Sequence, residues 1–162
     1  MIINGNALLK AAPIKGMIGT KERAHGVSYG LGEAGYDIRI KQEIEFRNGF
    51  DGPHVYIDGV AYPGSFIIAS AIDEFDMPED LVGIVHDKST WARRGLSVFN
   101  TVIEPGWKGF LTLELVHHGG GNLLIPAGAG IAQVIFHEVY APASYDGKYQ
   151  NQPNNPVGAI NG

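Results

Sequence analysis

The apolar residues of this chain come in short runs, and glycine, proline, asparagine or aspartate interrupts almost every one of them. The 162 residues include 23 glycines and 9 prolines, so few stretches are long enough for a helix. Short runs bounded by turn-forming residues are typical of an all-β barrel or sandwich. The length suits one domain with a sizeable core. We therefore predict a single all-β domain.

The apolar pattern predicts one short helix near the start of the chain and a series of strands after it. The helix covers residues 5–12, with an asparagine near its cap. A single helical turn is expected at residues 89–94, capped by Ser89 or Thr90. The strands are expected at residues 36–46, 54–62, 65–75 (after a Pro63-Gly64 turn), 81–86, 96–103, 110–116 and 131–139.

The composition changes after Pro142, where the chain becomes polar and rich in asparagine, glutamine, glycine and proline. Such a segment is typical of disorder when taken alone. Lys148 and Tyr149 within it instead indicate a segment that orders on a ligand. We expect a β domain over residues 1–142 and a tail over residues 143–162 that closes over the ligand.

The charge balance and the absence of cysteine limit the ligands and the catalytic groups that this chain can have. The net charge is −5, so no overall basic field attracts nucleic acid, and an anionic ligand needs local basic residues. Without cysteine there are no disulfides, thiolate nucleophiles or cysteine-based zinc sites. No signal peptide or membrane-spanning run is recognisable. We expect no membrane partner and a cytoplasmic location, which is the host cytoplasm if the chain is viral.

Three motifs carry a resemblance to a known family. They are DKSTWARRGL (residues 87–96), IEPGWKGFLTLEL (103–115) and GKYQNQ (147–152), with weaker matches in AGYDIRI (34–40) and GIAQVIF (130–136). The motifs are similar, in the same order, to those of the dCTP deaminase family. The second is the most specific, because trimeric dUTPases share its turn but not the glutamate of T-L-E-L.

The resemblance implies a dUTPase-like distorted barrel or jelly roll that assembles as a homotrimer, with sites at the subunit interfaces. The implied reaction converts dCTP to dUTP and ammonia without zinc. Mg²⁺ would accompany the triphosphate, held by phosphates and water and by no protein metal site. The implied ligands are dCTP and dUTP, with dTTP as an inhibitor.

Glu114 is the candidate for the central chemistry. Deamination at C4 of cytosine needs an activated water, a proton on ring N3 and release of ammonia, and one carboxylate can serve all these transfers. The six histidines show no H-x-E or HExxH pattern. Apolar neighbours would raise the pKa of Glu114 by desolvation. Alternation alone favours a glutamate on the solvent face, whereas the resemblance assigns it as the catalytic glutamate.

Lys88, Ser89 and Arg93 form a second candidate group. A serine at a helix start, with basic residues beside it, can hold an anion. The alternative is an ordinary capped turn with solvated charges. The resemblance places Ser89 at the phosphates and the catalytic water, and Arg93 in a neighbouring subunit's site. Lys88 stands at a family arginine, where it keeps the charge but loses the bidentate fork.

The remaining candidates are expected to bind substrate. Glu104 replaces a family aspartate beside the sugar 3′-hydroxyl, and its alternative role is that of a turn-capping acid. Asn100 replaces a usual alanine. It either bonds the base or a water, admits a modified cytosine, or is a neutral substitution. With these, the resemblance assigns substrate binding to Lys88, Ser89, Asn100, Glu104, Gln133, Lys148, Tyr149 and Gln152.

Several other polar and aromatic residues are expected to be structural. Asp37 is expected to pair with Arg39 or to lie at a subunit contact. Trp91 and Trp107 are expected to pack in the core or an interface, and His117-His118 is expected in a loop because no partner ligands stand at metal spacing.

Two alternative functions stay open at this point. One is a bifunctional enzyme that also cleaves dUTP to dUMP and pyrophosphate, which the GIAQVIF stretch favours. The other is a non-catalytic, nucleotide-binding regulatory trimer, which the departures at Lys88, Asn100 and Glu104 permit.

Overall fold

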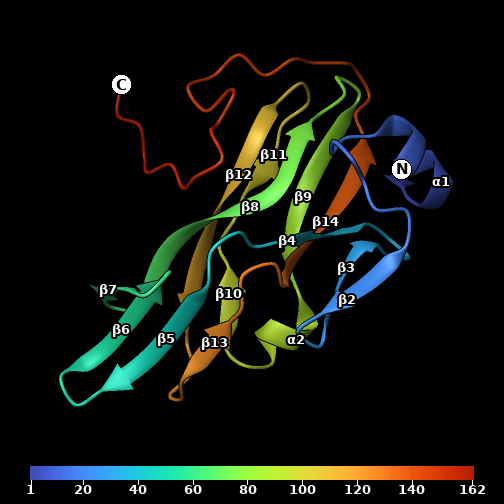
Figure 1. Cartoon of the computed structure of the whole chain (residues 1–162). Coiled ribbons are helices and arrows are strands. Elements are labelled where there is room, and N and C mark those ends of the chain that lie inside the picture. Colours follow the sequence, from blue (N-terminus) through green and yellow to red (C-terminus); the bar gives the residue numbers. More distant parts are fainter.

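Strands make up 49% of the chain and helices 7% (Figure 1). The computed structural model describes residues 1–162. In chain order the elements are β1 (Ile2–Ile3), α1 (Gly5–Ala11), β2 (Lys21–Ala24), β3 (Val27–Leu31), β4 (Tyr36–Arg39), β5 (Ile44–Gly49), β6 (Gly52–Ile57), β7 (Val60–Pro63), β8 (Phe66–Asp76), β9 (Leu81–Asp87), α2 (Ser89–Ala92), β10 (Leu96–Val98), β11 (Val102–Ile103), β12 (Lys108–His117), β13 (Leu123–Ile125) and β14 (Gly130–Glu138). The predicted all-β domain with a short N-terminal helix is confirmed. Neither helix has the length and apolar character needed to cross a membrane.

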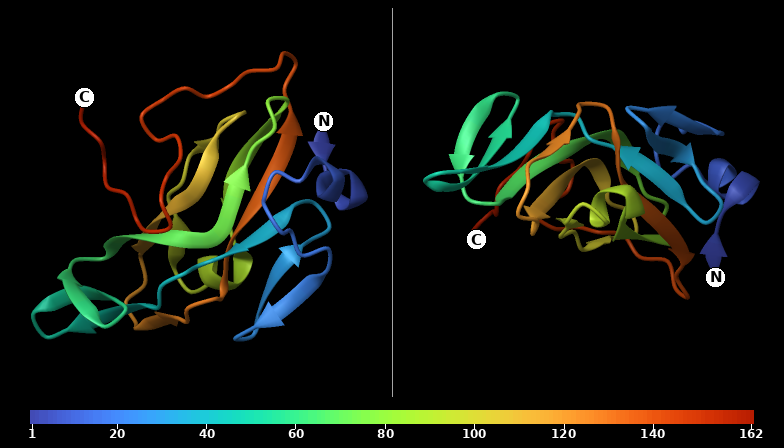
Figure 2. Two further views of the ribbon diagram at one scale, coloured as in Figure 1. Left: turned by 45° about the horizontal axis from the view of Figure 1, so that its top comes forward. Right: turned by 90° about the horizontal axis from the view of Figure 1, so that it is seen from below.

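The strands form three antiparallel sheets. The largest has seven strands, in the order β11-β9-β14-β4-β3-β2 with β1 added beside β14. A three-stranded sheet has the order β10-β12-β8, and a four-stranded sheet has the order β13-β5-β6-β7. Both views of Figure 2 show β5, β6 and β7 as an arm that extends away from the N-terminal helix.

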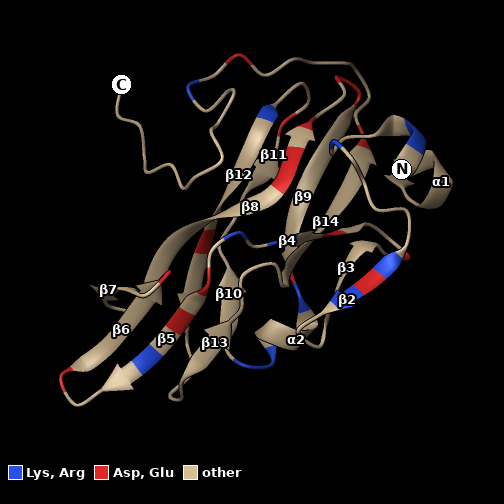
Figure 3. Cartoon of the chain, in the orientation of Figure 1, with Lys and Arg blue, Asp and Glu red and all other residues tan.

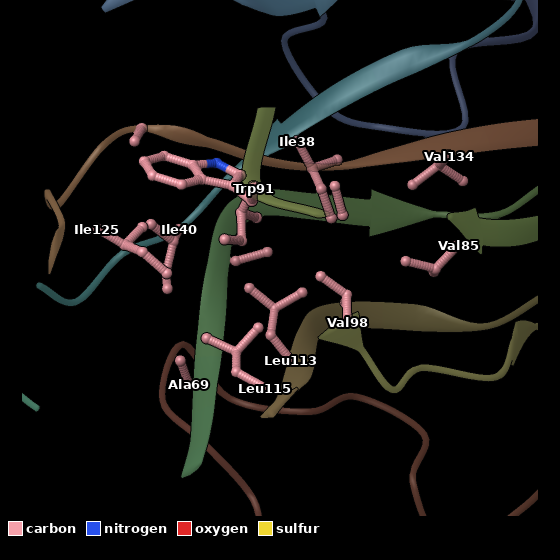
Figure 4. Close-up of a cluster of buried hydrophobic side chains, with 14 of the residues drawn as sticks. Ile38, Ile40, Ala69, Val85, Trp91, Val98, Leu113, Leu115, Ile125 and Val134 are labelled. Atoms are coloured by element: carbon pink, nitrogen blue, oxygen red, sulfur yellow. The ribbon is translucent and has the colours of Figure 1, made fainter. Parts of the chain in front are cut away.

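Side chains from all three sheets meet in one core of 30 buried hydrophobic residues (Figure 4). Leu113 and Leu115 of β12 point into it, as alternation along a strand with one buried face requires. Trp91 of α2 is buried in the same cluster, and its indole N–H donates to the Gly130 carbonyl oxygen at 2.6 Å. Trp107 is also buried and packs against Phe75. Both tryptophans therefore pack as expected.

The structure corrects the predicted strand over residues 96–103. This segment is two strands in different sheets, because β10 pairs with β12 whereas β11 pairs with β9. The three residues between them, Phe99 to Thr101, carry the chain across from one sheet to the other. Apolar pattern alone could not reveal this crossing, since each half keeps the alternation of a strand.

Other boundaries also differ from the expectation. The strand predicted at 54–62 is a hairpin that turns at Asp58-Gly59, both with positive φ, since this two-residue sequence suits the backbone twist of a tight hairpin. The hairpin of β2 and β3 was not predicted. α2 begins after Lys88, and no side chain caps it. His117 ends β12 and is buried against Phe46 instead of lying in a loop.

Candidate active site

A cavity of about 600 Å³ opens on the face of the three-stranded sheet that points away from the core. Its walls come from β8, β12, the crossing between β10 and β11, and the C-terminal tail. Five of the predicted site residues line it, and these are Asn100, Glu104, Glu114, Tyr149 and Gln152. The sheet therefore brings together residues up to 52 positions apart in the chain, from Asn100 to Gln152.

Glu114 lies on β12 opposite Ile68 of β8 and projects between the buried Leu113 and Leu115 to the other face of the sheet. That face is covered by the crossing and the tail, so the carboxyl is half-buried and not in open solvent. The carboxylate has no ion pair and accepts no side-chain hydrogen bond from the chain. Desolvation by burial raises the pKa of Glu114, and its own backbone N–H opposes this more weakly.

The raised pKa of Glu114 makes the stability of the protein depend on pH. The folded protein holds the proton more tightly than the unfolded chain does, so stability falls as pH rises from about 4.5 through the folded pKa. We expect Glu114→Gln to melt at a higher temperature than the wild type at neutral pH, because the amide carries no charge to desolvate. Thermal melts of both proteins between acid and neutral pH should show that the difference in melting temperature vanishes below the pKa of Glu114 in the unfolded chain. A difference that does not change with pH would contradict a raised pKa of Glu114.

Asn100 bridges the crossing to the strand that carries Glu114. Its Oδ1 accepts from the Glu114 backbone N–H at 3.0 Å, and its Nδ2 donates to the Thr112 carbonyl oxygen at 2.7 Å. The backbone N–H of Phe99 donates to the Glu114 carbonyl oxygen at 2.6 Å. The sequence predicted a bond to the base or to a water, admission of a modified cytosine, or a neutral substitution. The structure adds a role within the chain, since Asn100 bonds the backbone of β12.

The tail is tied by hydrogen bonds to β12 and to Trp107, the residue just before it. The Trp107 indole N–H donates to the Tyr149 carbonyl oxygen at 2.6 Å, and the Phe110 N–H donates to the Gln152 carbonyl oxygen at 3.1 Å. The hydroxyl of Thr112 donates to Oε1 of Gln152 at 3.3 Å and accepts from the Val157 N–H at 3.0 Å. Residues 143–162 contain no helix or strand, yet part of them forms one wall of the cavity.

Thr112 is a site residue that the sequence analysis missed. It is buried, lines the cavity and contacts the tail at two points. The signal was present, because Thr112 precedes Glu114 by two positions in the T-L-E-L motif and alternation places both on one face.

Lys88, Ser89, Arg93 and Gln133 lie outside this cavity. The Lys88 ammonium points inward to Oδ2 of Asp37, and both side chains are nearly buried. Ser89 begins α2 and Arg93 directly follows its last residue, and both are exposed. Figure 3 shows lysine and arginine spread over several elements and not gathered on one of them.

The expected pairing of Asp37 with Arg39 is wrong. Asp37 pairs with Lys88, and it also accepts a hydrogen bond from the Ser28 hydroxyl at 3.2 Å. Arg39 pairs instead with Asp73. Residues two apart share a face of β4, so alternation allows the expected pair. The nearer partners decide instead, because Ser28 and Lys88 lie at Asp37 whereas Asp73 lies at Arg39.

Glu104 lines the cavity, whereas Lys148 does not. Glu104 lies on the turn after β11 and is exposed at the cavity. The Lys148 ammonium donates to the Ile160 carbonyl oxygen and lies 5.4 Å from the centre of the Tyr149 ring. Lys148 does not line the cavity, although its neighbour Tyr149 does.

Comparison with known proteins places these features in a family. Residues 9–139 match the family model described as dCTP deaminase-like. A dCTP deaminase of Acidobacterium capsulatum is 33% identical, over 94% of this chain and 96% of that protein. A dCTP deaminase of Campylobacter concisus is 39% identical, over 78% of each chain.

Solved structures with a similar fold are dUTPases. The native EIAV dUTPase superposes with a TM-score of 0.52 at 19% identity, over 85% of this chain and 92% of that chain. A mutant dUTPase from phage phi11 of S. aureus, whose structure describes a structural Mg(II) ion, gives a TM-score of 0.53 at 16% identity, over 80% of this chain and 89% of that chain. At these identities the likeness shows a dUTPase-like fold.

Proposed function

The chain belongs to the dCTP deaminase-like family, and on this premise we propose that it deaminates dCTP hydrolytically to dUTP and ammonia. The observation that carries the proposal is Glu114, a half-buried carboxyl without an ion pair that faces a cavity of about 600 Å³. A carboxyl with a raised pKa in a cavity of nucleotide size is suited to proton transfer.

Glu114 alone can move every proton that the reaction needs. Its carboxylate accepts a proton from water, and the resulting hydroxide attacks C4 of the cytosine ring. The proton passes from Glu114 to ring N3, which gives a tetrahedral carbon that bears hydroxyl and amine. Glu114 then takes the hydroxyl proton and gives it to the amine, so ammonia leaves and the C4 carbonyl forms. A raised pKa favours both halves of this exchange near neutral pH.

We further propose that the site is completed by a second subunit of a homotrimer. The supporting observation is that Ser89 and Arg93 are exposed and lie outside the cavity of their own chain, although the resemblance gives both a role at the substrate. A neighbouring α2 would bring them to the phosphates. Lys88 can bind a phosphate only if its ammonium leaves Asp37. We therefore propose that it contributes less to phosphate binding than Ser89 and Arg93 do.

The proposed oligomeric state can be measured directly. Light scattering at working concentration should give a mass of about three times the 17.4 kDa of one chain. A mass near that of one chain would contradict the shared site.

Arg93→Ala should keep the trimer while lowering turnover, because its side chain is proposed to act in the neighbour's site.

Mg²⁺ is proposed to arrive with the triphosphate. No three histidine, cysteine, aspartate or glutamate side chains lie together in the chain. The ion would be held mainly by phosphate oxygens and water, as Mg²⁺ prefers. The ion would neutralise phosphate charge, while Glu114 keeps the proton transfers. We propose that zinc takes no part.

One incubation tests the function and its rivals. The purified protein is incubated with Mg²⁺ and dCTP, the nucleotides are separated, and ammonia and pyrophosphate are assayed. We expect dUTP and ammonia in equal amounts. Pyrophosphate with dUMP would identify the bifunctional enzyme, and tight binding of dCTP without any product would identify the regulatory trimer.

A further inference from the structure

The strand that carries Glu114 lacks a neighbouring strand along part of one edge. β10 pairs with β12 only from Leu96 opposite His117 to Val98 opposite Leu115, and the chain then crosses to the other sheet. On the opposite edge, the ladder with β8 is interrupted between Phe110 and Thr112. The backbone of β12 before Leu115 therefore has no β10 partner on one edge, and on the other edge its ladder with β8 is regular only from Thr112 onward. Backbone N–H and C=O groups at such a place need other partners.

The side chain of Asn100 supplies those partners. Its amide has an acceptor and a donor, like a peptide unit. The acceptor receives the Glu114 N–H at 3.0 Å, and the donor reaches the Thr112 carbonyl oxygen at 2.7 Å. With the bond from the Phe99 N–H to the Glu114 carbonyl oxygen at 2.6 Å, both backbone groups of Glu114 are held by the crossing.

We propose that Asn100 is a positioning residue, whose side-chain amide replaces the missing strand and fixes the backbone from which Glu114 projects into the cavity. The proposal rests on the proposed function, in which Glu114 moves the protons. Asn100 itself lines the cavity. Without its amide, the Glu114 N–H and the Thr112 carbonyl oxygen would bond to cavity water, and the carboxyl would gain freedom and hydration.

The first test is Asn100→Ala. A loosened catalytic group misaligns the attack while the nucleotide is held elsewhere, so kcat for dCTP should fall about 10- to 100-fold and KM should change little. The pKa of Glu114, followed by ¹³C NMR of its carboxyl without nucleotide and assigned with Glu114→Gln, should fall toward its ordinary value as water enters.

The matched control is Asn48→Ala. It makes the same chemical change and removes one comparable hydrogen bond, from Nδ2 to the Gly120 carbonyl oxygen at 2.7 Å, in the arm and away from the cavity. It should leave kcat and the Glu114 titration unchanged. Asn100→Asp keeps the acceptor but loses the donor. At alkaline pH, where kcat no longer changes with pH, its kcat should lie between those of Asn100→Ala and the wild type.

The outcomes separate this proposal from the proposed function. Wild-type kcat and wild-type titration in Asn100→Ala would overturn the positioning role. If Asn100→Ala does not fold, a wild-type kcat in Asn100→Asp would overturn it as well. If the unaltered protein does not deaminate dCTP, the proposed function fails, and the NMR titration still decides whether Asn100 holds Glu114.

Discussion

Glu114→Gln is expected to lower the turnover of dCTP by about 10³- to 10⁴-fold, the upper part of the range for loss of an acid–base group. The reason is that one carboxyl serves every proton transfer, so no second group retains part of the reaction. Glutamine keeps the shape and the hydrogen-bonding reach of glutamate but cannot accept the proton of water. The measurement is a deamination assay on the purified variant, with rates compared at saturating dCTP.

Binding of dCTP should survive this change. The phosphates and sugar are proposed to be held by other residues, so calorimetry should give an affinity close to that of the wild type. Chelators that strip zinc should leave wild-type activity intact once Mg²⁺ is restored. Near-normal turnover in Glu114→Gln would show that the protons move through another group, and the proposed mechanism would then be withdrawn.

Detaching the tail from β12 should have the second largest effect on activity, after Glu114→Gln. The tail is proposed to close over the nucleotide, with Lys148 at a phosphate and Tyr149 or Gln152 near the base or ribose. Deleting residues 145–162 removes one wall of the cavity and admits water, so kcat/KM should fall by about 10²-fold or more. Circular dichroism should still show the β domain. Full activity in the truncated protein would exclude a closing role for the tail.

Gly109→Ala displaces the tail without removing it. A Cβ at Gly109 would lie 2.5 Å from the backbone nitrogen of Gln152, and the glycine has a φ of +132°. The tail must therefore shift, and activity should fall toward that of the truncated protein. Gly64→Ala is the matched control, because Gly64 also has a positive φ of +96° but no atom within 4 Å of the added carbon. It carries the backbone strain without the clash and should stay active.

Alternation along residues 110–116 determined much of the site by itself. It placed Leu113 and Leu115 in the core and Glu114 on the opposite face, because successive side chains of a strand point to opposite sides. The short apolar runs determined the all-β class, and the ordered motifs identified the family. These features are local, so no knowledge of distant contacts was needed to read them.

Only the tertiary structure decided what lies over that opposite face. Alternation alone favoured solvent, but the crossing at Asn100 and the tail at Gln152 and Val157 cover Glu114 and raise its pKa. It also decided that Lys88 turns inward to Asp37 and that residues 96–103 divide between two sheets. Each of these depends on contacts between segments distant in the chain. Such contacts are selected by packing and hydrogen bonding in the whole fold, and the local pattern of residues does not encode them.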